Sequence, residues 1–293
     1  MSAVYRVLFP IDFASSRQTP PALWQIMMTR QLAEVTLLHV LDSRWNSARE
    51  NRLERAVTRM DIIAQRDFPG ACVVRRIERG NEVDQILECI RSAKTDLVVL
   101  PARSASWPGE RAPGQVAREI FREAPCSIWL DDASSPAATL DALRARPICC
   151  SIEGNDSDEY VLREAARLAS DLGARLTIVY ALLAEPGKST SPLCDPCTRR
   201  REIQSAEMRI DKLRRRFAPK ADLQVEVGIK ESVLSQVIRR HKPGLLVTVG
   251  DDDTAALAAE SVCPVWRLAR KTQCRVHIPI GRAAYAGQER RIA

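Results

Sequence analysis

The residues best suited to hold a charged ligand lie in LPARSASWPGERAPGQVAREIFREAPC, residues 100–126. An apolar, strand-like run ends at the start of this stretch, and a helical pattern begins at Pro113. Proline suits the first turn of a helix, where the amides of Gly114, Gln115 and Val116 would have no partner within the helix. Free amides at a helix N-terminus favour an anion. The stretch therefore predicts an anion site, although a plain strand-to-helix connection would also fit.

Asp12 is a second candidate, because it directly follows the first apolar run of the chain. Its carboxylate could face a ligand at the end of that strand. It could equally form a turn or cap before a helix that begins near Thr19. Both interpretations stay open at this point.

Other chemistry-bearing residues are few. Cys194 and Cys197 form a C-x-x-C pair, but a zinc site needs about four ligands and no second pair is near in sequence. None of the three histidines has a Ser or Asp at a spacing that suggests a nucleophile and its base. We therefore expect no metal site and no catalytic residues.

Composition is that of a globular chain. The 293 residues are 45% apolar and 28% charged, which leaves room for two domains of ordinary size. No apolar run approaches the roughly 20 residues that span a bilayer, and the N-terminus shows no basic segment followed by a long apolar one. The nine cysteines fall mostly in apolar segments. We expect a cytoplasmic protein with reduced thiols and no membrane association.

Positive charge is concentrated near the C-terminus. Residues 267–293 hold seven Lys and Arg against one Glu, so most of the formal net charge of +7 belongs to them. Such a tail is typical of a solvated or docking segment, and nucleic-acid binding is the less favoured interpretation. The arginines of residues 199–201 and 214–216 alternate with acidic residues, which favours a solvated helix face.

The chain is an internal duplication. Five blocks recur in the same order, residues 6–13 with 147–154, 32–41 with 173–182, 79–87 with 227–238, 96–101 with 244–250, and 124–130 with 261–268. The offset is 141 for the first two pairs, 148 for the next two and 137 for the last. The second half has thus gained seven residues in its middle and lost eleven between its fourth and fifth strands.

Apolar runs alternate with helical patterns in each half, which predicts a parallel sheet flanked by helices. Strands of the first half are expected at residues 4–10, 35–41, 71–78, 96–100 and 126–130, and helices at 48–67, 81–93 and 113–123. Asn81 is the expected N-cap of its helix. The predicted organisation is domain 1 at residues 1–132, a linker at 133–145, domain 2 at 146–270 and a basic tail at 271–293.

The motifs V-L-x-P-x-D at the first strand, T-L-L-H-V at the second and A-P-C-x-I at the last resemble those of the universal stress protein family. The resemblance covers both halves and identifies a tandem member. It implies an α/β fold of two flavodoxin-like, Rossmann-like domains, each an open five-stranded parallel sheet of order 3-2-1-4-5. It also implies domain pairing through the edge strand and, in one branch of the family, ATP binding.

The ATP-binding branch carries G-x2-G-x9-G-[ST] after the fourth strand. The matching positions here are Pro101, Ser104, Gly114 and Gln115, so the spacing is kept while one glycine of three remains. Pro101 has no amide hydrogen to offer a phosphate. The resemblance further implies that Asp12 meets the adenosine and that the backbone of Val40 reads the base.

The second half departs further from this pattern. Glu153 replaces the acidic Asp, the shortened loop at residues 249–260 has no phosphate-binding glycines, and Asp251, Asp252 and Asp253 would repel phosphate. We expect no ATP site there.

The sequence therefore predicts a stress-response or regulatory binding protein, not an enzyme, with at most one weak adenine-nucleotide site in domain 1. One alternative is an ATP-binding member with slow hydrolysis. Another is a scaffold whose basic tail docks on acidic partners or nucleic acid. The two halves are expected to pair within the chain as a pseudo-dimer, with a homodimer also open.

Overall fold

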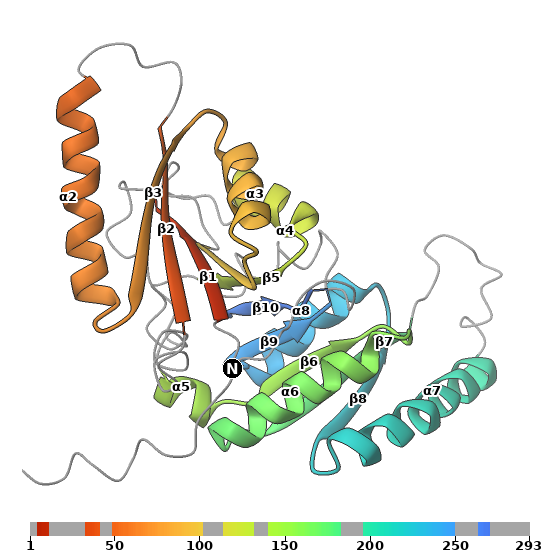
Figure 1. Cartoon of the computed structure of the whole chain (residues 1–293). Helices are drawn as coiled ribbons and strands as arrows, with labels where there is room; N and C mark the ends of the chain where they lie inside the picture. Colours follow the sequence, from red (N-terminus) through yellow and green to blue (C-terminus); the bar gives the residue numbers. More distant parts are fainter. Residues whose placement is uncertain are drawn as a thin grey trace, which may run out of the picture.

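The computed structural model describes residues 5–11, 33–41, 49–101, 114–131, 140–182, 196–249 and 263–269. Ten strands in these ranges form one continuous sheet in the order β3-β2-β1-β4-β5-β10-β9-β6-β7-β8 (Figure 1). Each half contributes five strands in the order 3-2-1-4-5, which confirms the predicted α/β fold and strand order.

The first half comprises β1 (Tyr5–Pro10), β2 (Ala33–Leu41), α2 (Arg49–Asp67), β3 (Cys72–Arg79), α3 (Glu82–Ser92), β4 (Leu97–Pro101), α4 (Gln115–Glu123) and β5 (Ser127–Asp131). The second half comprises α5 (Leu140–Ala145), β6 (Ile148–Ile152), α6 (Asp158–Leu172), β7 (Leu176–Leu182), α7 (Pro196–Phe217), β8 (Asp222–Val227), α8 (Lys230–His241), β9 (Leu245–Thr248) and β10 (Val265–Arg267).

Local sequence signals account for these bounds. The predicted strands of the first half lie within two residues of the observed ones. Asn81 caps α3 as predicted, because its side-chain oxygen accepts hydrogen bonds from the amides of Val83 at 2.9 Å and Asp84 at 3.2 Å. The final six residues of the predicted linker form α5, whose Leu143 is fully buried. That part of the linker is therefore packed against the protein.

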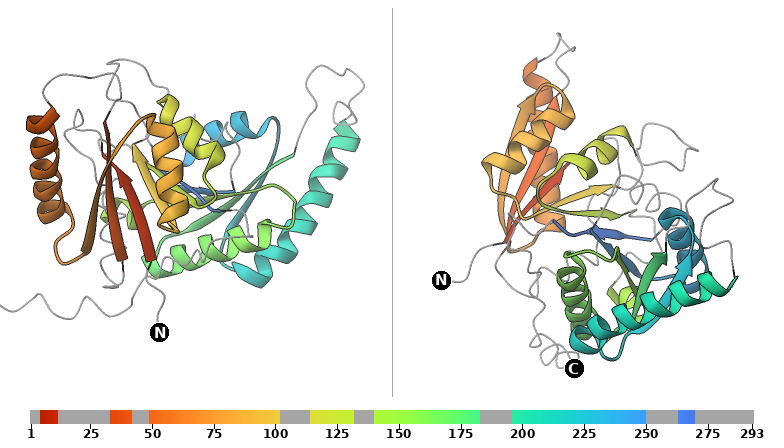
Figure 2. Two further views of the ribbon diagram at one scale, coloured as in Figure 1. Left: turned by 45° about the horizontal axis from the view of Figure 1, so that its top comes forward. Right: turned by 90° about the vertical axis from the view of Figure 1, so that its right-hand side faces the viewer.

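Successive residues of each strand point to opposite faces of the sheet, and an apolar layer covers each face. Val7 and Phe9 of β1 face the layer covered by α2, α5, α6 and α7. Leu8 faces the opposite layer, which α3, α4 and α8 cover. Both layers run through the two halves, so the sheet has a shared core. Figure 2 shows α2 and α7 at opposite ends of this sheet.

The halves join through β5 and β10. Strands within each half are parallel, but β10 pairs with β5 in antiparallel fashion, with Trp266 opposite Trp129. Both tryptophans are about 1% exposed. The predicted pairing of the two halves within one chain is thus present, through the edge strand of each half.

Candidate functional site

The first half has a natural ligand position at the carboxyl ends of β1 and β4. From β1 the chain moves to β2 on one side, and β4 lies on the other side of β1. In open parallel sheets this reversal of strand order leaves a crevice between the loops that follow the two strands. The loops here start after Ile11 and after Pro101.

The β1 side of this position is well fixed. Ile11 is 5% exposed and donates its amide to the carbonyl of Leu38 at 2.7 Å. His39 holds its Nδ1 at 3.0 Å from the carbonyl oxygen of Ile11. Asp12, which follows directly, lies outside the described residues. The position from which its chain departs is therefore set by two contacts to β2.

Val40 lies two residues beyond the last β1–β2 pair, Pro10 with Leu38. Its side chain is half-buried against the apolar layer formed by α3 and α4, and Val116 in the first turn of α4 packs on the same layer. The structure thus brings the predicted nucleoside-reading strand and the predicted phosphate-binding helix to the same face of the sheet.

The predicted phosphate-binding end of this position is the N-terminus of α4. Ala117, Ile120 and Phe121 are buried at the spacing of one helix face, which docks the helix on the sheet. Gly114 is the N-cap, with φ −56° and ψ 151°, and as a glycine it has no side chain to cap the helix. The first turn contains no acidic residue. Its amides and the positive end of the helix dipole can therefore receive an anion.

Gln115 takes no part through its side chain, since its Nε2 donates to Glu119 Oε1 at 2.7 Å along the helix. Only its backbone amide is available to a ligand. Pro101 is the exposed last residue of β4. Ser104 lies outside the described residues.

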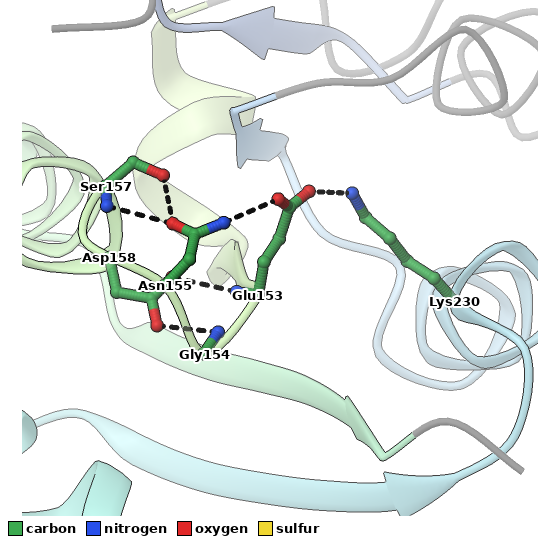
Figure 3. A network of polar contacts seen from close by, with 6 residues as sticks. All are labelled: Glu153, Gly154, Asn155, Ser157, Asp158 and Lys230. Carbon is green, nitrogen blue, oxygen red and sulfur yellow. Dashed lines mark hydrogen bonds and ion pairs between the residues drawn. The ribbon is translucent and has the colours of Figure 1, made fainter.

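In the second half, the residues that directly follow β6 form a polar network with one another and with Lys230 (Figure 3). Glu153, directly after β6, accepts a hydrogen bond from Lys230 Nζ through Oε1 and from Asn155 Nδ2 at 3.0 Å through Oε2. Lys230 begins α8, and its side chain is 15% exposed. The carboxylate that corresponds to Asp12 is therefore already paired with a cation.

Asp158 fixes the turn that carries this carboxylate. Its Oδ1 accepts the amide of Glu153 and its Oδ2 accepts the amide of Gly154, both at 2.8 Å. Burial raises the pKa of Asp158, while these backbone hydrogen bonds oppose the rise. The turn is closed by contacts within residues 153–158 and needs no ligand to hold its shape.

Side chains from β7 and α7 lie close to this turn at Gly154. Gly154 has φ +80°, and a Cβ there would lie 3.1 Å from both Tyr180 Oη and Arg209 Nη2. Arg209 of α7 donates to Tyr180 Oη at 3.0 Å. Tyr180 of β7 and Arg209 of α7 thus leave little space beside Gly154.

Sequence reasoning identified Glu153 but missed both Lys230, which pairs with it, and Arg209, which lies beside Gly154. At the repeat offset of 148, Lys230 occupies the position of Glu82 in the first half. This reversal of charge between the repeats was the one sequence feature that could have pointed to Lys230. Arg209 has no comparable signal, because it lies on α7, whose length differs between the halves.

The other residues singled out in the sequence form no metal-binding cluster among the described residues. Among the described residues no three His, Cys, Asp or Glu side chains come close enough to hold a metal ion. Cys197 is exposed on α7, and Cys194 lies outside the described ranges, as do Asp251, Asp252, Asp253 and the basic tail. No described helix is long and apolar enough to cross a membrane.

Comparison with known proteins agrees with this architecture. The model of the universal stress protein family matches residues 4–130. A search of curated proteins found no match. Among solved structures, a universal stress protein from Archaeoglobus fulgidus is 14% identical, with a TM-score of 0.60 over 90% of this chain and 96% of its own. A Pseudomonas aeruginosa protein provisionally assigned to the same family is 15% identical, with a TM-score of 0.62 over 91% and 93% of the chains.

Proposed function

We propose that the chain, whose residues 4–130 match the model of the universal stress protein family, is a regulatory binding protein of the stress response. It binds one adenine nucleotide weakly, at the carboxyl ends of β1 and β4, and makes or breaks no bond in it. The bound nucleotide biases the arrangement of the first half, and the second half carries no nucleotide.

Two observations support this proposal, one from each half of the chain. In the second half the carboxylate of Glu153 is paired with Lys230 and its turn is closed by Asp158. In the first half α4 begins at Gly114, which has no capping side chain of its own, and its first turn contains no acidic residue. An anionic ligand is accepted at the first position and meets a completed polar network at the second.

Weak binding follows from what the first position offers. The α4 amides can bind phosphate oxygens, but Pro101 contributes no amide where the family's first glycine stands. The nucleoside end depends on Asp12 and on the backbone of Val40, by resemblance to the family. A ligand held by one helix end and two nucleoside contacts is bound less tightly than one enclosed by a full glycine loop.

A binding role without covalent chemistry agrees with the state of the two adjacent thiols of β6. Cys149 and Cys150 of β6 are fully buried, and burial raises the pKa of Cys149 to about 12. The pKa of Cys150 is raised for the same reason. Burial thus favours the protonated thiol in both residues, and a thiol is a poor nucleophile compared with a thiolate.

The test is titration calorimetry of the full chain with ATP and, separately, with inorganic tripolyphosphate. We expect one ATP per chain and no release of phosphate over hours. Asp12→Ala should weaken ATP binding and leave tripolyphosphate binding unchanged, because it removes only the nucleoside contact. Asp156→Ala, an exposed acidic residue of the second half, is the control and should change neither.

Two results would overturn the proposal. Two ATP per chain would mean that the second position also binds nucleotide. Steady release of ADP would make the protein an ATPase.

A further inference from the structure

Helix α7 presents an exposed row of side chains with no carboxylate among them. At 3.6 residues per turn, positions three or four apart share a face. The row consists of Arg201, Ser205, Met208, Lys212, Arg215 and Arg216, which we name the basic stripe. All six residues are exposed, and Met208 is 65% exposed.

The opposite face of α7 holds the helix on the protein. Ala206 and Ile210 are buried, and Leu213 and Phe217 are partly buried against the same core. This apolar face packs against β8 and α6. Figure 2 shows α7 along the outer border of the second half, with its other side turned away from the sheet. The basic stripe therefore points to solvent.

The charges of α7 are segregated. The helix has eight Lys and Arg against three acidic residues. Glu202, Glu207 and Asp211 project about 90° or more from the middle of the stripe. Asp211 is shared by Arg214 and Arg215, at 2.7 and 2.6 Å, so one carboxylate offsets two guanidinium groups.

The other three cations of the stripe keep their charge unopposed. Among the described residues no carboxylate forms an ion pair with Arg201, Lys212 or Arg216. The N-terminal turn of α7 adds arginines at residues 199–201 and no acidic residue, an arrangement that the helix dipole disfavours. The sequence pattern favours an evenly solvated face, whereas the folded helix concentrates positive charge along one line.

We propose that the basic stripe is a docking surface for duplex nucleic acid, which it contacts through phosphates without recognising bases. Arg, Lys and Ser side chains supply hydrogen-bond donors of the kind that contact phosphates. The stripe extends about 21 Å from Arg201 to Arg215 at 1.5 Å per residue. A duplex presents phosphates at a fixed, short spacing over that length.

Two other partners fit less well. Insertion of α7 into a lipid surface as an amphipathic helix would need its apolar face, and that face is packed on β8 and α6. A flexible acidic peptide would have to be ordered over the full 21 Å, at a cost in entropy that a rigid duplex does not pay.

The experiment is fluorescence anisotropy of a labelled 20-base-pair duplex of arbitrary sequence, titrated with the full chain from 50 to 200 mM KCl. The test variant is Arg201→Gln/Lys212→Gln/Arg216→Gln. The control variant is Arg55→Gln/Lys94→Gln/Arg239→Gln, which removes three exposed cations from elsewhere. Both lower the net charge equally and keep the basic tail, so their difference isolates the stripe.

We expect the test variant to bind the duplex at least tenfold more weakly than the control at 50 mM KCl. Its plot of log K against log salt should be shallower by about 2.7, or 0.9 for each lost phosphate contact. Circular dichroism of both variants should match the wild type, which excludes unfolding as the cause.

Three outcomes would overturn the proposal. They are an absence of duplex binding by the wild type at 50 mM KCl, an equal loss in both variants, or stripe-dependent binding of polyglutamate without stripe-dependent binding of the duplex. The last would identify an acidic polypeptide as the partner. None of these depends on whether ATP binds to the first half.

Discussion

At the scale of single residues, Glu164 of α6 is a carboxylate held at 8% exposure. Burial raises its pKa above the ordinary 4.5, and Arg167 and Arg163 oppose the rise. Because the folded-state pKa exceeds the unfolded one, the ionised group costs stability above the folded pKa, and this cost vanishes below the unfolded pKa. Glu164→Gln should therefore raise the free energy of unfolding at pH 7 and lose that effect near pH ~4.

Urea unfolding at the two pH values checks this prediction. Glu159→Gln is the matched control on the same helix, because Glu159 is more exposed and pairs with Arg163 at 2.9 Å. A Glu164→Gln variant that is less stable at pH 7, or whose effect does not change with pH, would show that the carboxylate is favourable in its site.

Residue contacts over long sequence distances were the least predictable part of the molecule. Glu153 and Lys230 are 77 positions apart, and no local periodicity links them. Asp12 could be proposed because it follows a strand, and Gly114 and Gln115 because they lie at the start of a helix. Val40 was proposed from the resemblance to the family. Of these, the structure places Val40 and the start of α4 on one face of the sheet. The part played by Asp12 remains a prediction.

At the scale of elements, the equivalent helices α3 and α8 of the two halves differ in how their N-termini are capped. Asn81 caps α3 through its side chain, whereas Ile229, the repeat equivalent, begins α8 with no side-chain cap. Ile229 has the extended backbone that an N-cap needs, with φ −69° and ψ 134°, and is 44% exposed. An N-cap contributes about 1 kcal/mol. Asn81→Ala should therefore destabilise the protein by about 1 kcal/mol, and Ile229→Asn should stabilise it by up to about 1 kcal/mol.

Urea unfolding tests both predictions, by comparing the free energy of unfolding of each variant with that of the wild type. Ile229→Ala serves as control, since it removes the same apolar side chain without adding a cap. If Ile229→Asn is no more stable than Ile229→Ala, the start of α8 gains nothing from a capping oxygen, and its stability depends on packing alone.

Elements were predictable because their signals are local. The spacing of Ile86, Leu87 and Ile90 and the Asn81 cap together predict α3, and the structure confirms both. The short helix α5 was missed because only six residues carry it, within a segment whose start is polar. Its burial depends on Leu143, which packs beneath the distant Gly244.

At the scale of the whole molecule, Arg267 links the two halves. It is 5% exposed, and its Nη2 donates to the carbonyls of Ala124 at 2.8 Å and Cys126 at 3.0 Å, across the β5–β10 junction. Its guanidinium lies 5.1 Å from the centre of the Phe121 ring of α4. Arg267→Ala should lower the free energy of unfolding by about 3 kcal/mol, because two buried carbonyls lose a charged donor and a cavity remains.

Arg239→Ala, an exposed arginine of α8, should change the free energy of unfolding by less than about 0.5 kcal/mol. The unfolding of both variants in urea is measured by tryptophan fluorescence and by far-ultraviolet circular dichroism. A loss below about 1 kcal/mol for Arg267→Ala would mean that water or a rearranged side chain replaces the arginine at the junction.

The most direct test of the central claim concerns the α4 amides. Gln115→Pro removes one amide at the first helical position, where proline is tolerated, and Gly114 already has the extended backbone that precedes proline. Gln115→Ala loses the same contact to Glu119 but keeps the amide. A hydrogen bond to a charged group contributes about 1.5–3 kcal/mol. Calorimetry should therefore find that Gln115→Pro binds ATP about tenfold or more weakly than Gln115→Ala, at equal stability in urea. Equal ATP affinity in the two variants would contradict a phosphate site at the start of α4.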